Sequence, residues 1–408
     1  MPVIEAEKNL VAELRSARAE SDKLFTILKP DALYERPIAE RHRVIFYVGH
    51  LDAFDCILIC REALGIKSRD SELDTLFRAG IDPDSNHLPS DKQSDWPSIE
   101  NVRAYVKRCR AEVDDNLERA PEDVIHMALE HREMHLETLA YMFHNFEYNR
   151  KRTPSAMDQG DIAPSEWTNE WRDVPAGRVV LGKPHDSSFG WDNEYDELRT
   201  AVDGFRIQRY SVTNREYLRF VDEGAPIPNF WIRRGDLIYY RGMFEETPLP
   251  LDWPVYVTQE EAETYAKWMG KSLPTEEQFH RAAYGTLGGG EREYPWGTSE
   301  PAHNRGNFDF QSWDPQAVYA TPEGDSAFGV SQLTGNGWEW TRTQFAPFPG
   351  FKPHPSYPGY SANFFDGEHY VLKGGSARTA VRLLRRSFRN WFRHDYPYMY
   401  AKFRCVEN

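Results

Sequence analysis

Glycine and tryptophan are distributed unevenly along this chain of 408 residues, and the unevenness divides it into two parts. Only Gly49, Gly65 and Gly80 of the 27 glycines precede residue 155, as does only Trp96 of the 12 tryptophans. Because glycine weakens helices and marks turns, the first part can form long helices, whereas the second must consist of short elements and many turns. We predict a helical domain at 1–155, a linker at 156–174 and a mixed α+β domain at 175–408.

The helical part has four amphipathic segments, which we expect to form an up-and-down four-helix bundle. They are predicted at 3–28, 38–65, 98–119 and 122–148. Pro37 and Pro121 lie near two helix starts, where a missing N–H costs little, and Gly65 is expected to end the second helix. The loop at 80–98 is long for a bundle and is a candidate for a functional role.

In the second part, helical periodicity is confined to 259–270 and 275–284. Glycine, proline, asparagine and aromatic residues occur throughout the remainder of this part. Composition alone therefore predicts a compact α+β domain rich in irregular loops.

Charge and hydropathy exclude several classes of partner. The chain has 49 Lys plus Arg against 64 Asp plus Glu, a net charge of −15, so a phosphate backbone is a poor partner for it. No apolar stretch reaches the roughly 20 residues of a membrane helix, and the N-terminus shows no export signal. Four cysteines do not form a disulfide scaffold, and we interpret Cys56 and Cys60 as core thiols. We expect a cytoplasmic protein without nucleic-acid or membrane partners; the sequence does not indicate its oligomeric state.

Histidine spacing is the sharpest chemical signal in the chain. His131 and His135 stand four residues apart in a strongly helical segment, so their imidazoles share one helix face. His50 lies in an otherwise apolar stretch of another predicted helix. Three imidazoles from two bundle helices can hold one metal ion and leave its other positions open. Arg132 follows His131 where the zincin motif H-E-x-x-H has glutamate, so a metalloprotease is disfavoured.

The ligand types alone leave the metal and its surroundings open. Three imidazoles suit Zn(II) with a bound hydroxide and equally Fe(II) with positions for O2 and substrate, while a surface or core histidine pair is the alternative to any metal. Glu130, Glu133 and Glu137 are candidate acceptors for the ligand imidazoles. His126 and His144 point at other helical angles and are expected to be exposed.

Six segments of the second part resemble the sulfatase-modifying-factor type of domain, which has the C-type-lectin-like fold of formylglycine-generating enzymes. These segments are 212–220, 254–285, 294–297, 335–343, 373–380 and 385–405. The formylglycine generators rely on a reactive cysteine pair in this domain, whereas this chain has only Cys405 there. A thiol-based or copper-thiolate oxidase is therefore not expected.

The first part, with His50 and the H-x-x-x-H at 131–135, resembles the DinB-like domain. The two domains together resemble the ergothioneine-biosynthesis sulfoxide synthases over nearly the whole chain. This resemblance implies non-haem Fe(II) held by His50, His131 and His135, and it selects iron over zinc. It also implies O2-dependent coupling of the sulfur of cysteine or γ-glutamylcysteine to the imidazole C2 of hercynine as a sulfoxide. C–S bond formation and sulfur oxidation together release four electrons, all accepted by O2. No external reductant is needed, and no dinucleotide-binding G-x-G-x-x-G follows a predicted strand.

The resemblance also implies roles for residues of the second part. A tyrosine in the segment 354–365 is expected to donate a proton or an electron, with Tyr357 as the first choice and Tyr360 as the second. Asn390 is expected to hydrogen-bond hercynine, and Trp391 to face its trimethylammonium group through a cation–π contact. The simpler alternative for these aromatic residues is packing in the core.

The chain departs from one branch of that family at two positions. Met134 stands where the branch has a substrate-contacting glutamine, and Phe392 stands where it has an aspartate that holds the γ-glutamyl donor. Losing that carboxylate should weaken binding of the glutamyl ammonium, so free cysteine is the expected sulfur donor. The candidates for binding substrate carboxylates are Arg378, Arg382, Arg385, Arg386 and Arg393.

Other functions remain open at this stage. Relatives of this type couple cysteine to histidine itself (ovothiol-type chemistry) or a selenium donor to hercynine (selenoneine-type chemistry). A Zn(II) thiol transferase is a further alternative, because DinB-like bundles also serve that chemistry. A non-enzymatic binding module is the last, because lectin-like folds often bind ligands.

Overall fold

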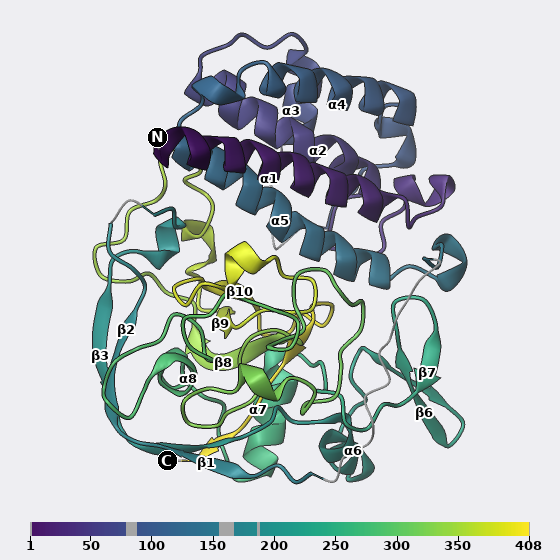
Figure 1. Cartoon of the computed structure of the whole chain (residues 1–408). Coiled ribbons are helices and arrows are strands. Elements are labelled where there is room, and N and C mark those ends of the chain that lie inside the picture. The colour runs from purple at the N-terminus through teal and green to yellow at the C-terminus, as the bar shows by residue number, and fades with distance from the viewer. Residues whose placement is uncertain (1, 79–87, 155–166, 186–187, 408) are drawn as a thin grey trace. The chain divides into compact units, whose positions relative to one another are not determined.

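The computed structural model describes residues 2–78, 88–154, 167–185 and 188–407, and the chain forms two compact units, Met1–Ala156 and Met157–Asn408 (Figure 1). The first unit is helical, and the second combines short strands with three α-helices within the described ranges. The predicted pairing of a helical bundle with an α+β domain is confirmed. Of the predicted loop and linker, 80–87 and 156–166 lie outside the described residues. In the described part, no helix is both long and apolar enough to cross a membrane.

The four predicted helices of the first unit are present. They are α1 (Pro2–Phe25), α2 (Val44–Cys56), α4 (Ile99–Asp114) and α5 (Glu122–His144). Pro121 is the N-cap of α5, as expected. The role predicted for Pro37 is wrong, because α2 begins only at Val44. Arg43 keeps an extended backbone there, and its guanidinium donates to Asp91 at 2.9 Å and to a backbone carbonyl at 2.7 Å.

Helix α2 continues without a break into a π-helical segment, η2 (Ile57–Ala63). Its wider turns are closed by i→i+5 hydrogen bonds, such as the one from the Leu64 N–H to the Ile59 carbonyl at 3.1 Å. Gly65, with φ of +66°, ends the segment and so confirms the predicted helix stop.

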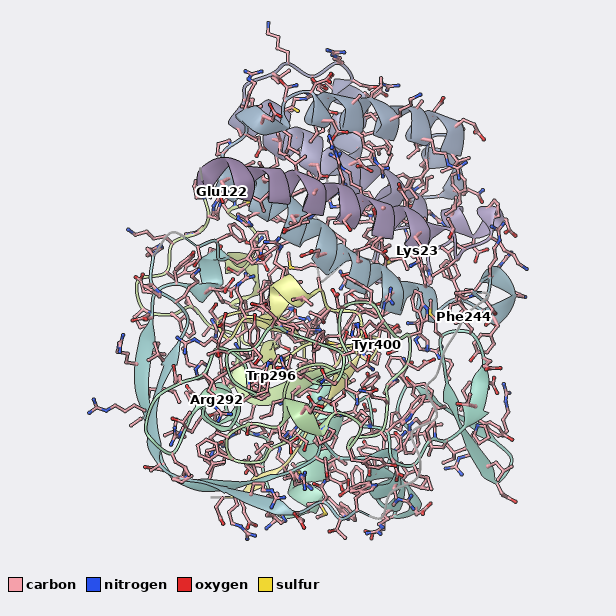
Figure 2. All side chains as sticks on the ribbon, in the orientation of Figure 1. Lys23, Glu122, Phe244, Arg292, Trp296 and Tyr400 are labelled. Atoms are coloured by element: carbon pink, nitrogen blue, oxygen red, sulfur yellow. The ribbon has the colours of Figure 1, made fainter. Side chains whose placement is uncertain are left out.

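The up-and-down order expected for the bundle is wrong. Helices α1 and α5 are parallel, because Ser21 of α1 contacts Arg132 of α5 and, further along both helices, Phe25 contacts Phe143. In agreement, Figure 2 places Lys23, near the end of α1, and Glu122, at the start of α5, at opposite ends of the bundle. Helix α2 is antiparallel to α5, and α1 is antiparallel to α4, as the order of their side-chain contacts shows. Helices α2 and α4 are therefore parallel. The chain returns between them through a connection that holds α3 (Ser71–Arg78), a helix the sequence analysis did not predict.

Three α-helices of the second unit begin in the same way. They are α6 (Asn214–Asp222), α7 (Gln259–Trp268) and α8 (Glu276–Tyr284). Each is preceded by a threonine that forms a capping box with a Glu or Gln three residues later. Helices α7 and α8 confirm the prediction, whereas α6 was missed although its Thr213–Glu216 capping box is visible in the sequence.

The strands of the second unit form small sheets. In the described residues they are β1 (Trp171–Val174), β2 (Gly177–Leu181), β3 (Leu198–Val202), β4 (Phe205–Gln208), β5 (Trp231–Arg234), β6 (Leu237–Arg241), β7 (Glu246–Pro248), β8 (Trp338–Gln344), β9 (His369–Lys373), β10 (Asn390–Arg393), β11 (Ala401–Lys402) and β12 (Val406–Glu407). The sheet orders are β1-β4-β12, β2-β3, β5-β6-β7 and β10-β9-β8-β11. Only the β8–β11 pair is parallel among these ladders.

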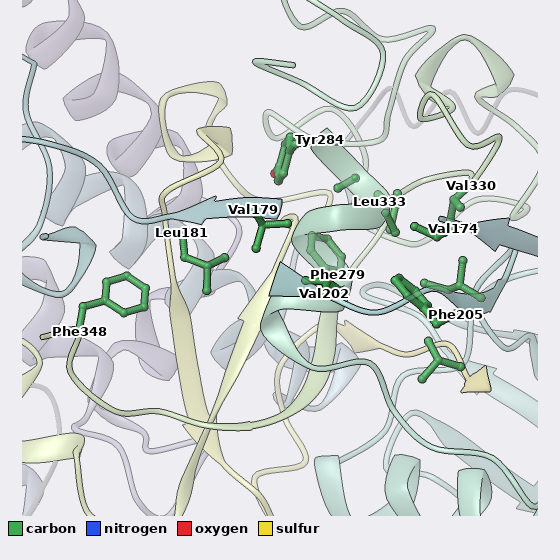
Figure 3. Close-up of a cluster of buried hydrophobic side chains, with 14 residues drawn as sticks. Val174, Val179, Leu181, Val202, Phe205, Phe279, Tyr284, Val330, Leu333 and Phe348 are labelled. Carbon is green, nitrogen blue, oxygen red and sulfur yellow. The ribbon is translucent and has the colours of Figure 1, made fainter. Parts of the chain in front are cut away.

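A hydrophobic core lies where α8 packs on the strands β2 and β3, and side chains of β4 take part in it (Figure 3). Phe279 of α8 is fully buried there among branched and aromatic side chains such as Val179 and Phe205. Burying a large apolar side chain contributes about 1.5–3 kcal/mol, so this core holds the helix on the strands.

Candidate metal centre

Three histidines of the first unit converge at one point. His50 comes from α2, and His131 and His135 come from the antiparallel α5. One nitrogen of each ring lies within 4.8 Å of the others, and the Nε2 atoms of His131 and His135 are 3.2 Å apart. Nitrogens bound to one ion at about 2.1 Å lie roughly 3–3.5 Å apart, so this pair already has the spacing of two metal ligands.

The tautomer of His50 is set by a backbone carbonyl. Its Nδ1 lies 2.7 Å from the carbonyl oxygen of Phe77, at the end of α3. A carbonyl only accepts, so Nδ1 carries the proton and Nε2 keeps its lone pair. That Nε2 is buried and has no hydrogen-bond partner among the described residues, as expected of an atom that would hold a metal.

All three imidazoles are neutral at physiological pH. Burial lowers the pKa of His50 to about 4, and it lowers the pKa values of His131 and His135 well below the ordinary value. Neighbouring histidines and arginines act in the same direction. Because only a neutral imidazole offers a lone pair, burial keeps the cluster ready for a cation.

Aromatic rings hold two of the imidazoles in place. Phe46 stacks on His50 with ring centroids 4.7 Å apart, and Phe54 stacks on His131 at 3.4 Å. These contacts restrict rotation of the imidazoles about their side-chain bonds. The site is thus preorganised by packing as well as by the hydrogen bond from His50.

A buried ionic network lies beside the cluster and joins the same helices. Arg132, fully buried next to His131, donates to Asp52 at 2.9 Å, to Asp55 at 2.7 Å and to the Ser21 hydroxyl at 3.0 Å. Burial favours a raised pKa for Asp52, but the charges and hydrogen bonds of its arginines hold that pKa below its ordinary value. The network ties α5 to α1 and α2. This network can be predicted from the sequence, because two aspartates in an otherwise apolar helix need a cationic partner when they are buried.

For the other residues of α5, the sequence predicted glutamate acceptors for the imidazoles and two exposed histidines. Glu130 and Glu137 are buried and Glu133 is half-buried, but the acceptor that the structure gives for His50 is a carbonyl of α3. The predicted exposure of His144 is wrong: it is 1% exposed, because α5 is buried on most sides. His126 is half-buried rather than exposed.

The candidate tyrosines of the second unit lie in a loop that hydrogen-bonds to Asp192, in the short 3-10 turn Asp192–Glu194. Tyr360 is buried, with its ring stacked on Trp191 at 3.9 Å, whereas Tyr357 is half-buried with its centroid 5.7 Å from Tyr360. Asp192 accepts hydrogen bonds from the Ser361 hydroxyl and, at 3.4 Å, from the His354 N–H. These contacts hold both ends of the tyrosine loop.

Asn390 and Trp391, which are expected to contact hercynine, lie in strand β10, which pairs with β9. Successive side chains of a strand point to opposite sides, so Trp391 faces away from Asn390 and Phe392. One face of Trp391 lies on Phe345, with ring centroids 4.3 Å apart and nearly parallel. The half-buried Asn390 side chain accepts from the N–H of Trp391 at 2.9 Å.

Most of the candidate arginines interact with groups of their own unit. Arg378 lies on the Trp313 ring at 3.9 Å and donates to the Phe310 carbonyl at 2.7 Å. The pairs formed by three others are Arg385–Glu194, Arg386–Glu291 and Arg393–Asp395. Arg382 is half-buried, and burial together with Arg385 lowers its pKa. Met134 is half-buried on α5, directly before His135.

Comparison with known proteins gives two family matches. The model of the sulfatase-modifying factor enzyme 1-like domain matches residues 160–408, and the DinB superfamily model matches residues 13–147. The protein named Hercynine oxygenase from Mycobacterium tuberculosis is 35% identical over 327 residues, which cover 73% of this chain and 74% of that protein. Its namesake from Mycolicibacterium smegmatis is 34% identical over 335 residues, with the same coverage of both chains.

Fungal relatives match more of the chain at lower identity. Ergothioneine biosynthesis protein 1 of Neurospora crassa is 28% identical over 94% of this chain, and its counterpart in Schizosaccharomyces pombe is 29% identical over the same share. The chain spans 56% and 54% of these two proteins, about half the length of each.

Proposed function

Because this chain belongs to the hercynine oxygenase family, we propose that it is a non-haem Fe(II), O2-dependent sulfoxide synthase. It would couple the sulfur of a thiol substrate to the imidazole C2 of hercynine, in the synthesis of ergothioneine. The observation that carries the proposal is the cluster of His50, His131 and His135, with its buried neutral imidazoles.

The donor set suits ferrous iron. Three neutral imidazoles would occupy one side of the ion, leaving positions for small ligands. When bound, iron would supply the redox chemistry by which O2 accepts four electrons from the two substrates. The protein's own part is to hold the ligands: the Phe77 carbonyl keeps the proton of His50 on Nδ1, so that Nε2 is the ligand atom.

Residues of the second unit would handle the substrates and the proton. We assign Tyr357 as the proton or electron donor because it is the more exposed of the two tyrosines: it is half-buried and meets Trp191 edge-on at 6.4 Å, whereas Tyr360 is buried with its ring stacked on Trp191 at 3.9 Å. Tyr360 is the second candidate. Because Asn390 and Trp391 point to opposite sides of β10, we assign them as alternatives: either Asn390 would hydrogen-bond hercynine, or Trp391 would meet its trimethylammonium group through the ring face that Phe345 does not cover.

Free cysteine is the proposed sulfur donor. Met134 and Phe392 are apolar, so neither supplies the polar contacts that a γ-glutamyl group needs. Comparing turnover of cysteine and γ-glutamylcysteine at fixed hercynine tests this assignment. A preference for the dipeptide would contradict it. Replacing hercynine by histidine, or cysteine by a selenium donor, separates the ovothiol-type and selenoneine-type alternatives in the same assay.

The function is tested by anaerobic loading with Fe(II), followed by O2 uptake. Uptake should require hercynine and cysteine together, and His131→Ala or His135→Ala should abolish it by removing a ligand. His126→Ala, on the same helix but outside the cluster, is the matched control and should retain activity. Product formation without O2 would favour a Zn(II) thiol transferase, and indifference to Fe(II) would favour a binding module; either result contradicts the proposal.

The donor role is tested separately by Tyr357→Phe. We expect this variant to bind iron normally but to shift the products from the coupled sulfoxide towards oxidation of the thiol substrate to a sulfinate. Tyr360→Phe is the comparison variant. An unchanged product distribution in Tyr357→Phe would remove this tyrosine from the mechanism.

A further inference from the structure

A groove with a volume of about 480 Å³ lies between α1, α2 and α4 of the first unit. Its walls are α1 from Ser21 onward, with the turn that continues to Leu33, and α4 from Ile99 to Arg110. Helix α2 adds buried side chains such as Leu51. The three clustered histidines are not among the described residues that line it. Sites for small organic ligands have volumes of roughly 300–1,000 Å³, so the groove is large enough for such a ligand.

The groove is elongated along α4. Its lining on this helix extends from Ile99 to Arg110, which is about 16 Å at a rise of about 1.5 Å per residue. Helix α1 runs antiparallel to α4, and the Arg110 guanidinium donates to Asp22 at 2.7 Å, where it joins the two helices at one end of the groove. A ligand that fills this space is therefore an extended chain rather than a compact ion.

Apolar side chains line much of the groove, and several of them are incompletely buried. The half-buried members of this lining are Phe25, Val48, Ile99 and Val106. The surface that they leave exposed is shared by α1, α2 and α4, so a single chain in the groove would cover all of it. Removing apolar surface from water favours binding, so the ligand has an apolar body.

Three exposed cations also line the groove. Arg103 and Lys107 stand four residues apart on one face of α4, a spacing at which like charges disfavour a helix. The third is Arg152, whose backbone N–H donates to the Ile27 carbonyl at 2.8 Å and so holds this residue beside the end of α1. None of the three cations forms an ion pair within the described part of the chain.

The acidic residues of the groove do not neutralise these cations. Asp22 and Asp52 both accept from the guanidinium of Arg110, at 2.7 and 2.9 Å. Asp52 also accepts from Arg132 at 2.9 Å. The unpaired charge along the groove is therefore positive, although the chain as a whole carries −15. Arginine and lysine donate charge-assisted hydrogen bonds to carboxylates, so an anionic group complements this lining.

We propose that this groove binds an elongated organic anion, the class to which medium-chain carboxylates belong. The apolar chain lies on the half-buried side chains, and the carboxylate is held at the edge of the groove by Arg103, Lys107 and Arg152. An uncharged chain would leave these cations without a counterion, and a cationic chain would be repelled. The groove is separate from the histidine cluster, so this site does not depend on the proposed sulfoxide synthase activity.

Calorimetric titration of the full-length protein with decanoate tests the proposal, at concentrations too low for micelles. We expect one molecule of decanoate to bind. Decanol should bind roughly tenfold or more weakly, because it lacks the charge-assisted hydrogen bonds, and decyltrimethylammonium should not bind measurably. Equal affinities for decanoate and decanol, binding of many decanoate molecules at once, or no binding of decanoate would each overturn the proposal. So would sedimentation with vesicles of phosphatidylcholine and phosphatidylglycerol by a protein that does not bind free decanoate.

Charge reversal tests the role of the cations. The double variant Arg103→Glu, Lys107→Glu should bind decanoate roughly tenfold or more weakly, and it should fold normally because both side chains are exposed. The matched control is Lys67→Glu with Arg233→Glu, which makes the same change of charge at exposed residues outside the groove. Its affinity should be unchanged. An equal loss in both double variants would mean that only net charge matters, and this would contradict the assigned site.

Isoleucine methyl NMR locates the bound chain without any substitution. The methyl signals of Ile99, in the groove, should shift on addition of decanoate. Those of Ile66 should not, because this residue lines a different cavity, next to Arg61 and Tyr105. A shift of Ile66 with an unchanged Ile99 would overturn the proposal.

Discussion

Nδ1 of His50 lies 2.7 Å from the carbonyl oxygen of Phe77, so the orientation of one candidate metal ligand depends on a short helix that contributes no ligand. The acceptor is backbone, so the position of the chain at residue 77 matters more than the side chain there. Perturbing the packing of α3 on α2 should therefore reach the metal centre without any change to a ligand.

Gly49→Ala is the direct way to move Phe77. An added Cβ would lie 2.4 Å from Cε1 of the Phe77 ring, so the ring and its helix must shift. We expect a loss of about 1–3 kcal/mol in unfolding free energy and weaker Fe(II) binding. Urea unfolding and anaerobic metal titration measure the two effects. Gly288→Ala, where the nearest atom is 4.0 Å away, is the control; equal behaviour of the two variants would contradict this view.

Arg132→Met should be strongly destabilising. The change leaves Asp52 and Asp55 buried without the guanidinium that bridges them, and breaking a buried pair costs about 3–5 kcal/mol. Urea unfolding measures the loss. Arg108→Ala, which breaks an exposed pair with Asp70, should cost less than about 1 kcal/mol. A cost for Arg132→Met as small as that would mean that the network does not brace the helices.

Asp192→Ala should act on the reaction through the tyrosine loop. Without the carboxylate, Ser361 and His354 lose their common acceptor, and the loop that carries Tyr357 is less constrained. We expect unchanged iron content but a shift of products in the same direction as in Tyr357→Phe. Product analysis by mass spectrometry measures this shift, with the exposed Asp203→Ala as control. A change in overall rate with an unchanged product ratio would speak against such positioning.

Glu194 should contribute stability that depends on acid pH. Burial would raise its pKa, but Arg385 and the hydroxyl of Ser387 hold the folded pKa below the ordinary 4.5. The stabilisation is therefore complete above pH 4.5 and is lost as pH falls through the lower, folded pKa. Glu194→Gln should cost about 3 kcal/mol at pH 7, and its difference from the natural protein should narrow below pH 4. Urea unfolding at several pH values measures this; a constant difference would contradict it.

The sequence allowed the histidine cluster to be predicted because helical periodicity alone places His131 and His135 on one face. It did not predict the acceptor for His50, since a backbone carbonyl has no signature in the side chains. Helix α3 was missed because eight residues give little periodicity. The parallel course of α2 and α4 depends on how a connection folds back, which local patterns do not encode.

The π-helical turn of η2 could not be predicted from the sequence either. Its residues have ordinary helical propensities, and the widening is known only once the hydrogen bonds are seen. Conversely, the capping box of α6 and the aspartates of α2 are sequence signals from which that helix and a buried cationic partner can be predicted.

Helix α2 carries polar groups towards three different neighbours: His50 towards the imidazoles of α5, Asp52 towards arginines, and Cys56 towards Glu112 of α4. A slip of one residue would rotate the helix by about 100° and would break all of these contacts at once. These three sets of contacts therefore fix both the rotation and the axial position of α2. A purely apolar interface would tolerate small shifts of the helix, whereas this one does not.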